Sequence, residues 1–310
     1  MSLFLRNTTF SQLAALDAVA RLGSVSRAAH ELNRTQPAVS IQIKLLEELA
    51  GAPLLQRSGR GIRLTETGGV LASFASRILA LWREAGHEME TLSGAFAGAL
   101  RVGAVTTAEY LLPPLLVTFA NDNPKVSVTL HVGNRDAIVR MLAAHEIDLA
   151  IMGRPPAELR TVSSTFAKHP MGFIAAPDHP LIRKRRLGLA GLAGEHMLVR
   201  ERGSGTRANV ERLFKQAGLT LRVGSELSSN EAIKQMTAAG FGIGFLSLHT
   251  CALELATGVV ALLPLANNPI AREWYVIHAK GRQVPRVAAA FEEFLTARAQ
   301  AEIDRHLGRY

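Results

Sequence analysis

The chain has 310 residues, 48% of them hydrophobic and 20% charged, which excludes a disordered chain and fits two or three globular domains. Lys and Arg number 35 against 26 Asp and Glu, so the formal net charge of +9 favours a polyanionic partner: nucleic acid, an anionic membrane face, or small phosphorylated or carboxylated ligands. The single cysteine, Cys251, excludes an intrachain disulfide and a Cys-rich zinc site.

The sequence shows no pattern typical of export or membrane insertion. Asp17 interrupts the apolar residues near the start, where a signal peptide would need an unbroken apolar core. The longest apolar runs, at 111–117 and 241–248, are far shorter than the ~18 residues of a membrane helix. We therefore expect a cytoplasmic protein without a membrane partner.

The first 50 residues predict three helices. Apolar residues at spacings of three and four predict a helix over 10–21 that ends at Gly23. Ser24 can cap a short second helix. Thr35 can cap a third helix, with Pro37 in the first turn, where its missing N–H costs nothing.

A β-hairpin is predicted after the third helix. Two short extended segments, 54–57 and 62–65, flank the Gly-rich turn 58–61. Helix, short helix, turn, helix and hairpin in this order indicate a winged helix-turn-helix. Residues 1–65 are therefore expected to form an N-terminal all-α winged DNA-binding domain.

Residues 66–94 predict a long linker helix. Thr65 is a suitable N-cap, and a helix of about 27 residues at 1.5 Å each is a rod of roughly 40 Å. Apolar residues at steps of three and four form a coiled-coil seam, which packs either on its own domain or on a second copy. The position of the helix between two domains favours a homodimer. The seam consists of Leu71, Phe74, Ile78, Trp82, Ala85, Met89 and Leu92.

From residue 99 onward, predicted strands alternate with predicted helices. The strands are expected at 100–105, 126–132, 149–152, 173–176, 243–248 and 274–279, and the helices at 111–120, 137–144, 206–217, 233–239 and 287–307. Such alternation argues for mostly parallel sheets with helices on both faces. Some ~210 residues exceed one compact sheet, so 95–310 should form an α/β domain of two lobes. Lobe I is expected at about 99–166 plus 268–310, and lobe II at about 167–267.

The strongest motif lies in the predicted helix-turn-helix, over 27–32 and 35–47. Together with 10–21 before it and with 54–57 and 64–68 after it, this motif closely resembles the DNA-binding domain of LysR-type transcriptional regulators. The resemblance implies a two-lobed, periplasmic-binding-protein-like effector domain after the linker helix. It also implies a tetramer built as two dimers on double-stranded DNA, and it leaves RNA polymerase open as a further partner.

The third helix is expected to enter the major groove of DNA. Its N-terminal residues would meet base edges, where Gln36 and Gln42 can read bases by paired hydrogen bonds and Ser40 can serve a base or a phosphate. Val39 and Ile43 should face the core instead. The expected DNA-binding residues are Thr35, Gln36, Pro37, Ala38, Ser40, Ile41, Gln42 and Lys44 of this helix, and Arg57, Arg60 and Arg63 of the hairpin.

Ile41 departs from the LysR pattern, because family members often carry a polar or basic residue at this place. An apolar side chain there can contact a thymine methyl group but cannot read guanine. We therefore expect Ile41→Val to be tolerated.

Three segments of the C-terminal part combine features of an anion site. Residues 106–107, 202–207 and 228–231 each precede a predicted helix, whose free N–H groups attract anions. Gly203 and Gly205 allow the backbone to approach a ligand closely. Each segment alone is more often an ordinary cap, but three segments that follow strands favour a ligand site. The resemblance places an effector between the two lobes.

Further segments look like the regulators of carbon-fixation (Calvin-cycle) operons within this family. These segments are 133–135, 147–156, 202–207, 229–235 and 246–250. Because those regulators sense phosphorylated sugars or nucleotides, the cleft is expected to bind a small anionic metabolite.

Arg135, Arg154 and Arg207 are the expected cations for this ligand, because a guanidinium can clamp a phosphate or carboxylate with two hydrogen bonds. The alternative is that they pair internally with an acidic side chain, namely Asp136, Asp148 or Glu231. The expected effector-binding residues are Thr106, Thr107, Arg135, Arg154, Arg202, Ser204, Thr206, Arg207 and Asn230.

Two other classes of function stay open: a constitutive DNA-binding repressor without an effector, and an enzyme on the same two-lobed fold. The enzyme is disfavoured, because the sequence has no HExxH metal motif, no phosphate-binding loop and no GxSxG elbow. We therefore expect no catalytic residue, metal or cofactor. Thermal-shift screening against sugar phosphates, nucleotides and carboxylates would separate the three classes.

Overall fold

The computed structural model describes residues 7–58, 61–92, 97–185, 187–281 and 283–308, with the backbone alone described at 83–84, 87–88 and 90–92. The chain divides into an N-terminal unit, Met1–Ser93 with Ala144–Glu146, and a C-terminal unit, Gly94–Ala143 with Ile147–Tyr310. Within the described ranges, no helix has the length and apolar character needed to cross a membrane.

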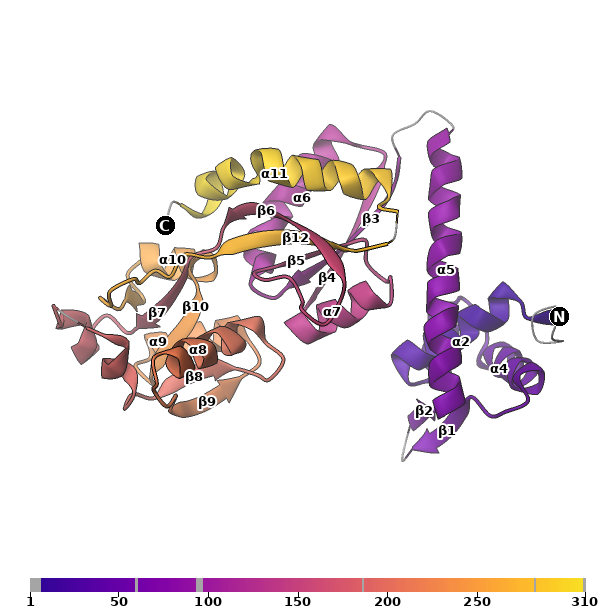
Figure 1. The fold of residues 1–310 in the computed structure, drawn as a ribbon, viewed down its shortest axis with the longest axis horizontal. Helices are drawn as coiled ribbons and strands as arrows, with labels where there is room; N and C mark the ends of the chain where they lie inside the picture. The colour runs from indigo at the N-terminus through magenta and orange to yellow at the C-terminus, as the bar shows by residue number, and fades with distance from the viewer. Residues whose placement is uncertain (1–6, 59–60, 93–96, 186, 282, 309–310) are drawn as a thin grey trace. The chain divides into compact units, whose positions relative to one another are not determined.

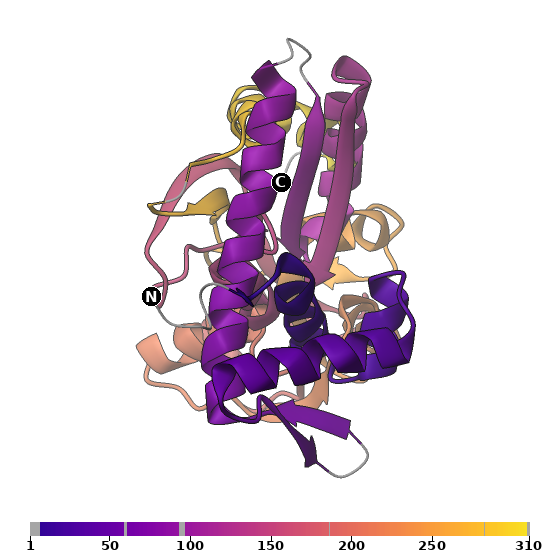
Figure 2. The same cartoon turned by 90° about the vertical axis from the view of Figure 1, so that its right-hand side faces the viewer.

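Among the described residues from Phe10 onward, the N-terminal unit contains three helices, a hairpin and one long helix (Figure 1). Their bounds are α2 (Phe10–Leu22), α3 (Val25–Glu31), α4 (Gln36–Ala50), β1 (Leu55–Ser58), β2 (Gly61–Leu64) and α5 (Glu66–Leu92). These elements confirm the predicted helices and hairpin. Figure 2 shows the hairpin beside α4, at the beginning of α5.

Caps and left-handed residues set the ends of these helices. Thr9 and Gln12 form a reciprocal capping box at the start of α2, and the side chain of Thr35 accepts a backbone N–H in the first turn of α4. Gly23 and Gly51 end these two helices at φ angles of 60° and 69°, a conformation that costs glycine little.

The core of the N-terminal unit lies between α2, α3 and α4. Val39 and Ile43 are buried in it, as predicted, and so is Leu46. The carboxylate of Glu47, at the end of the same helix, accepts the backbone N–H of Leu54 at 2.8 Å. This bond anchors the hairpin to the end of α4.

Most of the predicted seam on α5 is exposed in the single chain. Leu71 packs against the core of the N-terminal unit, and the side chain of Leu92 lies outside the described part. Trp82 and Met89 are 63% and 73% exposed. The exposed members of the seam are Phe74, Ile78, Trp82, Ala85 and Met89.

The C-terminal unit contains two five-stranded sheets, each with helices around it (Figure 1). Lobe I consists of β3 (Gly98–Val105), α6 (Leu112–Asp122), β4 (Val126–Gly133), α7 (Arg135–Ala143), β5 (Leu149–Met152), β6 (Thr161–Lys168), β12 (Glu273–Ala279) and α11 (Arg286–Leu307). The strands of its sheet lie in the order β4-β3-β5-β12-β6. Lobe II consists of β7 (Met171–Ala175), β8 (Met197–Arg200), α8 (Gly205–Gln216), β9 (Val223–Leu227), α9 (Asn230–Ala238), β10 (Ile243–Ser247), α10 (Ala252–Ala256) and β11 (Ala261–Leu262). The strands of its sheet lie in the order β11-β7-β10-β8-β9. Short 3₁₀ helices lie at Ala108–Tyr110, Pro180–Arg183, Leu189–Leu192 and Leu248–Cys251.

The expectation of mostly parallel sheets is confirmed, but each sheet has one strand that runs against the others. In lobe I, β12 runs antiparallel to both β5 and β6, and in lobe II, β7 runs antiparallel to β10 and β11. These strands belong to the stretches where the chain passes from one lobe to the other. No helical crossover returns the chain to the same sheet there, so nothing imposes the parallel direction.

The two passages between the lobes are hydrogen-bonded to each other. The first lies between β6 and β7, and the second between β11 and β12. The backbone N–H of His169 donates to the carbonyl of Arg272 at 2.7 Å, and Met171 and Ile270 exchange two backbone bonds at 3.0 and 2.7 Å. The lobes are therefore joined by a short two-stranded hinge.

Candidate nucleic-acid interface and effector cleft

The predicted DNA-reading side chains lie on the solvent side of α4. Those of Ala38 and Gln42 are half-buried, and the others on this helix are exposed: Thr35, Gln36, Pro37, Ser40, Ile41 and Lys44. Ser26 of α3 donates to the Gln36 amide oxygen at 3.2 Å. This contact orients the amide and leaves its NH₂ group available for a base edge.

The hairpin presents its arginines on two different faces. Arg57 lies opposite Ile62 in the antiparallel register, whereas Arg63 lies opposite Gln56. Because side chains alternate along a strand, the exposed Arg57 and Arg63 project from opposite faces. Arg60 lies outside the described residues. The two described arginines therefore cannot contact the same phosphate side by side.

The structure supports the prediction that Ile41→Val is tolerated, because Ile41 is 56% exposed and supports no core contact that Val would lose. Val keeps a branched apolar surface for a thymine methyl group. We expect the variant to retain its sequence preference in a competitive gel shift against mismatched operator fragments. Loss of that preference would show that Ile41 does more than make this contact.

A cavity of about 660 Å³ lies between the lobes. Among the predicted effector residues, those that line it are Thr106, Thr107, Arg135, Arg154, Arg202, Ser204, Thr206 and Arg207. Asn230 does not line the cavity. It is 3% exposed, and its side-chain oxygen accepts a hydrogen bond from Arg200. Asn230 therefore has a structural partner that the sequence alone did not indicate.

The N-terminus of α8 forms one wall of this cavity. Ser204 stands at the N-cap position, but its side chain makes no capping hydrogen bond. The first backbone bond of the helix comes from the N–H of Ala208, which donates to the Ser204 carbonyl. The N–H groups of 205–207 precede that bond, and this positive end of the helix favours an anion. Gly203 before it has a φ of 83°, and a Cβ there would lie 2.8 Å from Asp136 Oδ2.

Two of the three predicted cations are already paired. Arg135 contacts Glu158 at 2.7 Å, and this ion pair lowers the pKa of Glu158 to about 2. Arg207 contacts Glu211 at 2.7 Å and also Glu226. Within the described part of the chain, Arg154 forms no ion pair with a carboxylate, unlike the other two.

The alternative pairings of the predicted cations are realised only in part. Asp136 does contact Arg135, at 3.5 Å. Asp148 instead pairs with Arg101 at 2.5 Å, and Glu231 pairs with Lys234 at 2.6 Å.

Arg200 was missed by the sequence reasoning although it connects the two lobes. Its side chain is 1% exposed at the end of β8 in lobe II. It forms a bidentate ion pair with Glu201 at 2.8 and 3.1 Å, and it donates to the Thr106 hydroxyl of lobe I at 2.9 Å. The sequence feature that could have identified Arg200 is its position directly after the apolar run 197–199.

A buried aromatic stack lies beside the hinge. The ring of His169 stacks on Trp274 with 3.7 Å between the centroids, and the Trp274 indole N–H donates to His249 Nδ1 at 3.2 Å. Burial lowers the pKa of His249 to about 4, although the charge of Asp304 opposes this shift, and it holds the pKa of His169 well below its usual range. Both imidazoles are therefore neutral at pH 7.

These two histidines predict a loss of stability in acid. In the unfolded chain each titrates near pH 6.5, so the contribution of the neutral form is fully present above that pH and is lost as the pH falls. At pH 5 the loss from His249 should be about 2 kcal/mol. Urea unfolding at pH 7.5 and 5.0 measures it. His249→Asn should lose correspondingly less stability between the two pH values, and equal losses would contradict this origin.

Cys251 is fully buried, and burial raises the pKa of its thiol to about 12. A thiol of this kind stays protonated at pH 7, so it is not a reactive thiolate. The residue belongs to the core of lobe II.

Comparison with known proteins matches both units of the chain. Residues 10–69 match the model for bacterial regulatory helix-turn-helix proteins of the lysR family, and 93–300 match the LysR substrate binding domain. The chain is 45% identical over 289 residues to the HTH-type transcriptional regulator CbbR of Rhodospirillum rubrum, a match that covers 93% of this chain and 96% of that protein.

Two further relatives concern function more directly. The RuBisCO operon transcriptional regulator of Allochromatium vinosum is 38% identical over 293 residues, covering 94% of this chain and 97% of that protein. The regulatory domain of Synechocystis PCC6803 CcmR, solved in complex with 2-PG, is 39% identical with a TM-score of 0.62. That match covers 64% of this chain and 96% of the CcmR domain.

Proposed function

This chain belongs to the LysR family of DNA-binding transcriptional regulators, and from that premise we propose that it controls carbon-fixation genes in response to a small phosphorylated anion bound between its lobes. Its relatives are transcriptional regulators, and this chain is likewise a regulator and not an enzyme. The similarity to a RuBisCO operon regulator supports the choice of genes. The CcmR domain solved with 2-phosphoglycolate (2-PG) supports the choice of ligand.

The observation that carries the ligand proposal is the uncapped N-terminus of α8 in the wall of the cavity. A helix end with free N–H groups stabilises a phosphate or carboxylate by hydrogen bonds and by the helix dipole. Ser204 adds a hydroxyl that no capping bond occupies. Thr107, from the opposite lobe, lines the same cavity. A ligand held at α8 would therefore contact both lobes.

The DNA-binding surface of this proposal consists of α4 and the hairpin. The exposed Gln36 and Ser40 would meet base edges, and Lys44, Arg57 and Arg63 would neutralise phosphates. Each phosphate contact releases counterions, so affinity for operator DNA should fall steeply with salt. Because bacterial genes lie in the cytoplasm, we place the protein there.

A second copy of the chain is the proposed partner of α5. The exposed seam that includes Phe74, Ile78 and Trp82 is apolar and continues along the helix, as a coiled-coil partner requires. Two winged domains held by paired α5 helices would read two half-sites. We propose that two such dimers form a tetramer on the promoter.

One matched pair of variants tests the ligand site at a single atom. Gly205 is the first residue of α8, where proline is tolerated, and Ser204 before it has the extended backbone (ψ 132°) that proline requires. Gly205→Pro removes one N–H group and should weaken 2-phosphoglycolate binding by roughly tenfold or more. Gly205→Ala keeps that N–H, and its Cβ would meet nothing closer than 3.8 Å.

Isothermal titration of the full-length chain with 2-phosphoglycolate, other sugar phosphates and nucleotides measures these affinities. Equal affinities of the Pro and Ala variants would place the ligand elsewhere. A wild-type chain that binds none of these compounds, yet holds its promoter fragment in a gel shift, would favour a constitutive repressor. Gel shifts with and without ligand then show whether the effector alters DNA binding.

A further inference from the structure

A second recess, of about 890 Å³, opens beside the hinge of the C-terminal unit. Arg154, Arg212 and Arg272 line both this recess and the cleft, so they form the wall between the two. We propose that these three guanidinium groups, here called the arginine triad, form a second anion-binding site that takes a phosphate or carboxylate group. This site is separate from the N-terminus of α8 and goes beyond the proposed function.

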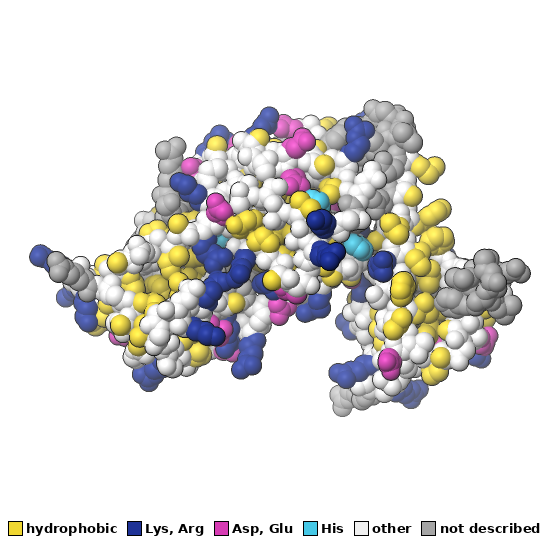
Figure 3. Space-filling view, in the orientation of Figure 1, with side chains coloured by type: hydrophobic (Ala, Val, Ile, Leu, Met, Phe, Trp, Pro, Cys, Tyr) yellow, Lys and Arg dark blue, Asp and Glu magenta, His cyan; other side chains and the backbone are white. Residues whose placement is uncertain are grey.

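The arginine triad gathers from three parts of the fold. Arg154 follows β5 of lobe I, Arg212 lies on α8 of lobe II, and Arg272 lies in the hinge directly before β12. In Figure 3, Lys and Arg side chains gather between β12 and α8 on the face that is shown. The fold brings these three cations together from distant segments, whereas a run of charges on an exposed loop is adjacent only in sequence.

The hydrogen bonds of the arginine triad go to neutral acceptors. Arg212 and Arg272 both donate to one atom, the side-chain oxygen of Asn209, which is 9% exposed. Arg272 also donates to the carbonyl of Gly153 at 3.0 Å. Among the described residues, no carboxylate forms an ion pair with any of the three arginines. Several guanidinium donors therefore have no acceptor of opposite charge.

Burial and charge repulsion within the triad both lower the pKa values of Arg212 and Arg272. Burial lowers the pKa of Arg212, and the charge of Arg154 lowers it further. Burial also lowers the pKa of Arg272, and the charges of Arg212 and Arg154 add to that effect. In addition, Arg272 Nε is buried without a hydrogen-bond partner. An oxyanion would relieve the repulsion and accept bonds from the planar guanidinium forks.

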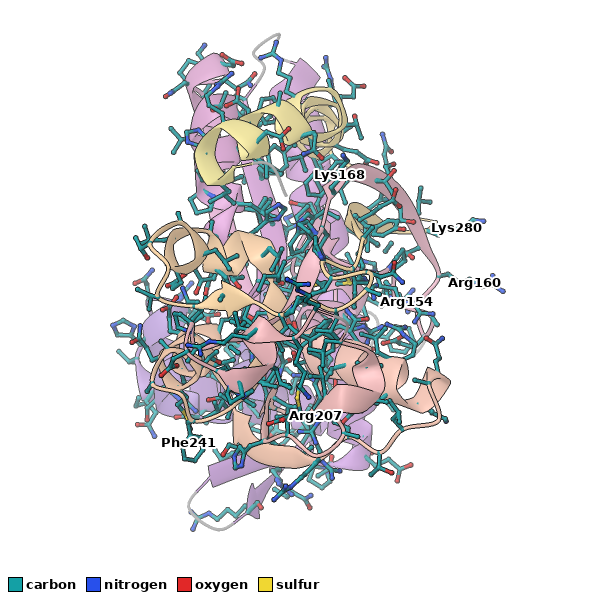
Figure 4. All side chains as sticks on the ribbon, turned by 90° about the vertical axis from the view of Figure 1, so that its left-hand side faces the viewer. Arg154, Arg160, Lys168, Arg207, Phe241 and Lys280 are labelled. Atoms are coloured by element: carbon teal, nitrogen blue, oxygen red, sulfur yellow. The ribbon has the colours of Figure 1, made fainter. Side chains whose placement is uncertain are left out.

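The surroundings of the recess add a fourth cation. Lys168 lines the recess but not the cleft. Figure 4 shows Arg154 between Lys168 and Arg207 in that view, whereas Arg160 and Lys280 point away from the molecule. Glu273 also lines the recess, and its carboxylate accepts a bond from the Tyr275 hydroxyl at 3.1 Å.

Binding at the triad would act on the angle between the lobes. Arg154 belongs to lobe I and Arg212 to lobe II, and Arg272 lies in the hinge that joins them. An anion in contact with all three favours the arrangement in which they meet. By linkage, such an anion would change the affinity of any ligand in the cleft that prefers one lobe arrangement.

Arg212→Gln and Lys215→Gln are the matched variants for the test. Both remove one positive charge from α8, but Lys215 is exposed and lines neither cavity. We would titrate the full-length chain with inorganic phosphate at constant ionic strength, using chloride as the reference salt. We expect Arg212→Gln to weaken phosphate binding by about tenfold or more and Lys215→Gln to leave it unchanged.

Two further readouts separate this site from the cleft and from a structural role. Lys168→Gln changes a residue that lines the recess but not the cleft, so it should weaken phosphate binding and still bind 2-phosphoglycolate at α8. Gly205→Pro should still bind phosphate at the triad. Without added anion, the melting temperature of Arg212→Gln should equal or exceed that of the wild type, because a like charge is removed and Asn209 keeps Arg272 as its donor.

Three outcomes would overturn the proposal. The first is equal phosphate affinity in Arg212→Gln and Lys215→Gln, and the second is a wild type that binds no phosphate at millimolar concentration. The third is a single 2-phosphoglycolate per chain that both Arg212→Gln and Gly205→Pro weaken, which would make the triad part of the cleft site.

Discussion

Replacing Gly68 by alanine is expected to unfold the N-terminal unit and to abolish DNA binding, whereas the same change at Gly69 should be harmless. A Cβ on Gly68 would lie 2.0 Å from the carbonyl oxygen of Leu54 and 2.8 Å from its carbonyl carbon. A Cβ on Gly69 would meet nothing within 4 Å. The two glycines are neighbours on α5, so they form a matched pair that differs only in the room available for a Cβ atom.

The clash at Gly68 cannot be relieved by a side-chain rotation, because the opposing atoms belong to the backbone. Leu54 is fully buried, and its carbonyl oxygen accepts the backbone N–H of Thr65 at 3.0 Å. The Thr65 hydroxyl donates to the Pro53 carbonyl at 2.7 Å and accepts the Gly68 N–H at 3.0 Å. Moving α5 away from Leu54 would therefore break these hydrogen bonds, which hold the hairpin beside α4.

We expect Gly68→Ala to cost at least about 3 kcal/mol and Gly69→Ala to gain up to about 1 kcal/mol, the difference in helix propensity between the two residue types. Circular dichroism during urea unfolding measures both values, and a gel shift on promoter DNA reports the function. A Gly68→Ala variant with wild-type stability would show that the hairpin and α5 are not in the contact described above.

The N-terminal unit follows closely from the sequence because its signals are local. Thr35, Pro37 and Gly51 mark the two ends of α4 by capping and by φ preference, and each acts within a few residues. The Gly-rich segment predicted as a turn likewise lies between two strands that pair with each other. Local chemistry of this kind is present in the sequence before any tertiary contact forms.

The C-terminal unit was predicted less completely, because part of its structure depends on distant contacts. β6 and β9 are edge strands whose polar residues interrupt the apolar run that marks a strand in a sequence. β8 has a buried run of three apolar residues, too short to stand out in the sequence. The antiparallel direction of β7 and β12 follows from the passages between lobes, which no local pattern encodes.

Positions in the candidate cleft were predicted better than the partners of its residues. The expectation that 106–107 and 202–207 meet at one ligand site agrees with the cavity, which Thr106, Ser204 and Arg207 line. The sequence did not show that Arg207 is neutralised by Glu226, nor that Arg212 and Arg272 share one acceptor. Ion pairing depends on side chains from separate elements, so spacing along the chain carries no information about it.

Replacing Arg200 by methionine is expected to destabilise the C-terminal unit by about 3 kcal/mol and to weaken effector binding. Methionine has a similar length but no donors. It would leave the Glu201 carboxylate without its bidentate partner and the buried Asn230 oxygen without the Arg200 donor. Removing one member of a buried ion pair is costly because the remaining charge keeps its desolvation penalty.

The loss should extend to the cleft, because Arg200 is a direct contact between lobes. Its donor to the Thr106 hydroxyl ties β8 of lobe II to the end of β3 in lobe I, where Thr106 lines the cavity. Lys215→Met is the matched control, because Lys215 is an exposed cation of the same lobe and lines neither cavity. Urea unfolding and titration with 2-phosphoglycolate measure the two effects. If Arg200→Met lost stability but kept full ligand affinity, Arg200 would support lobe II alone and the Thr106 contact would not position the cleft.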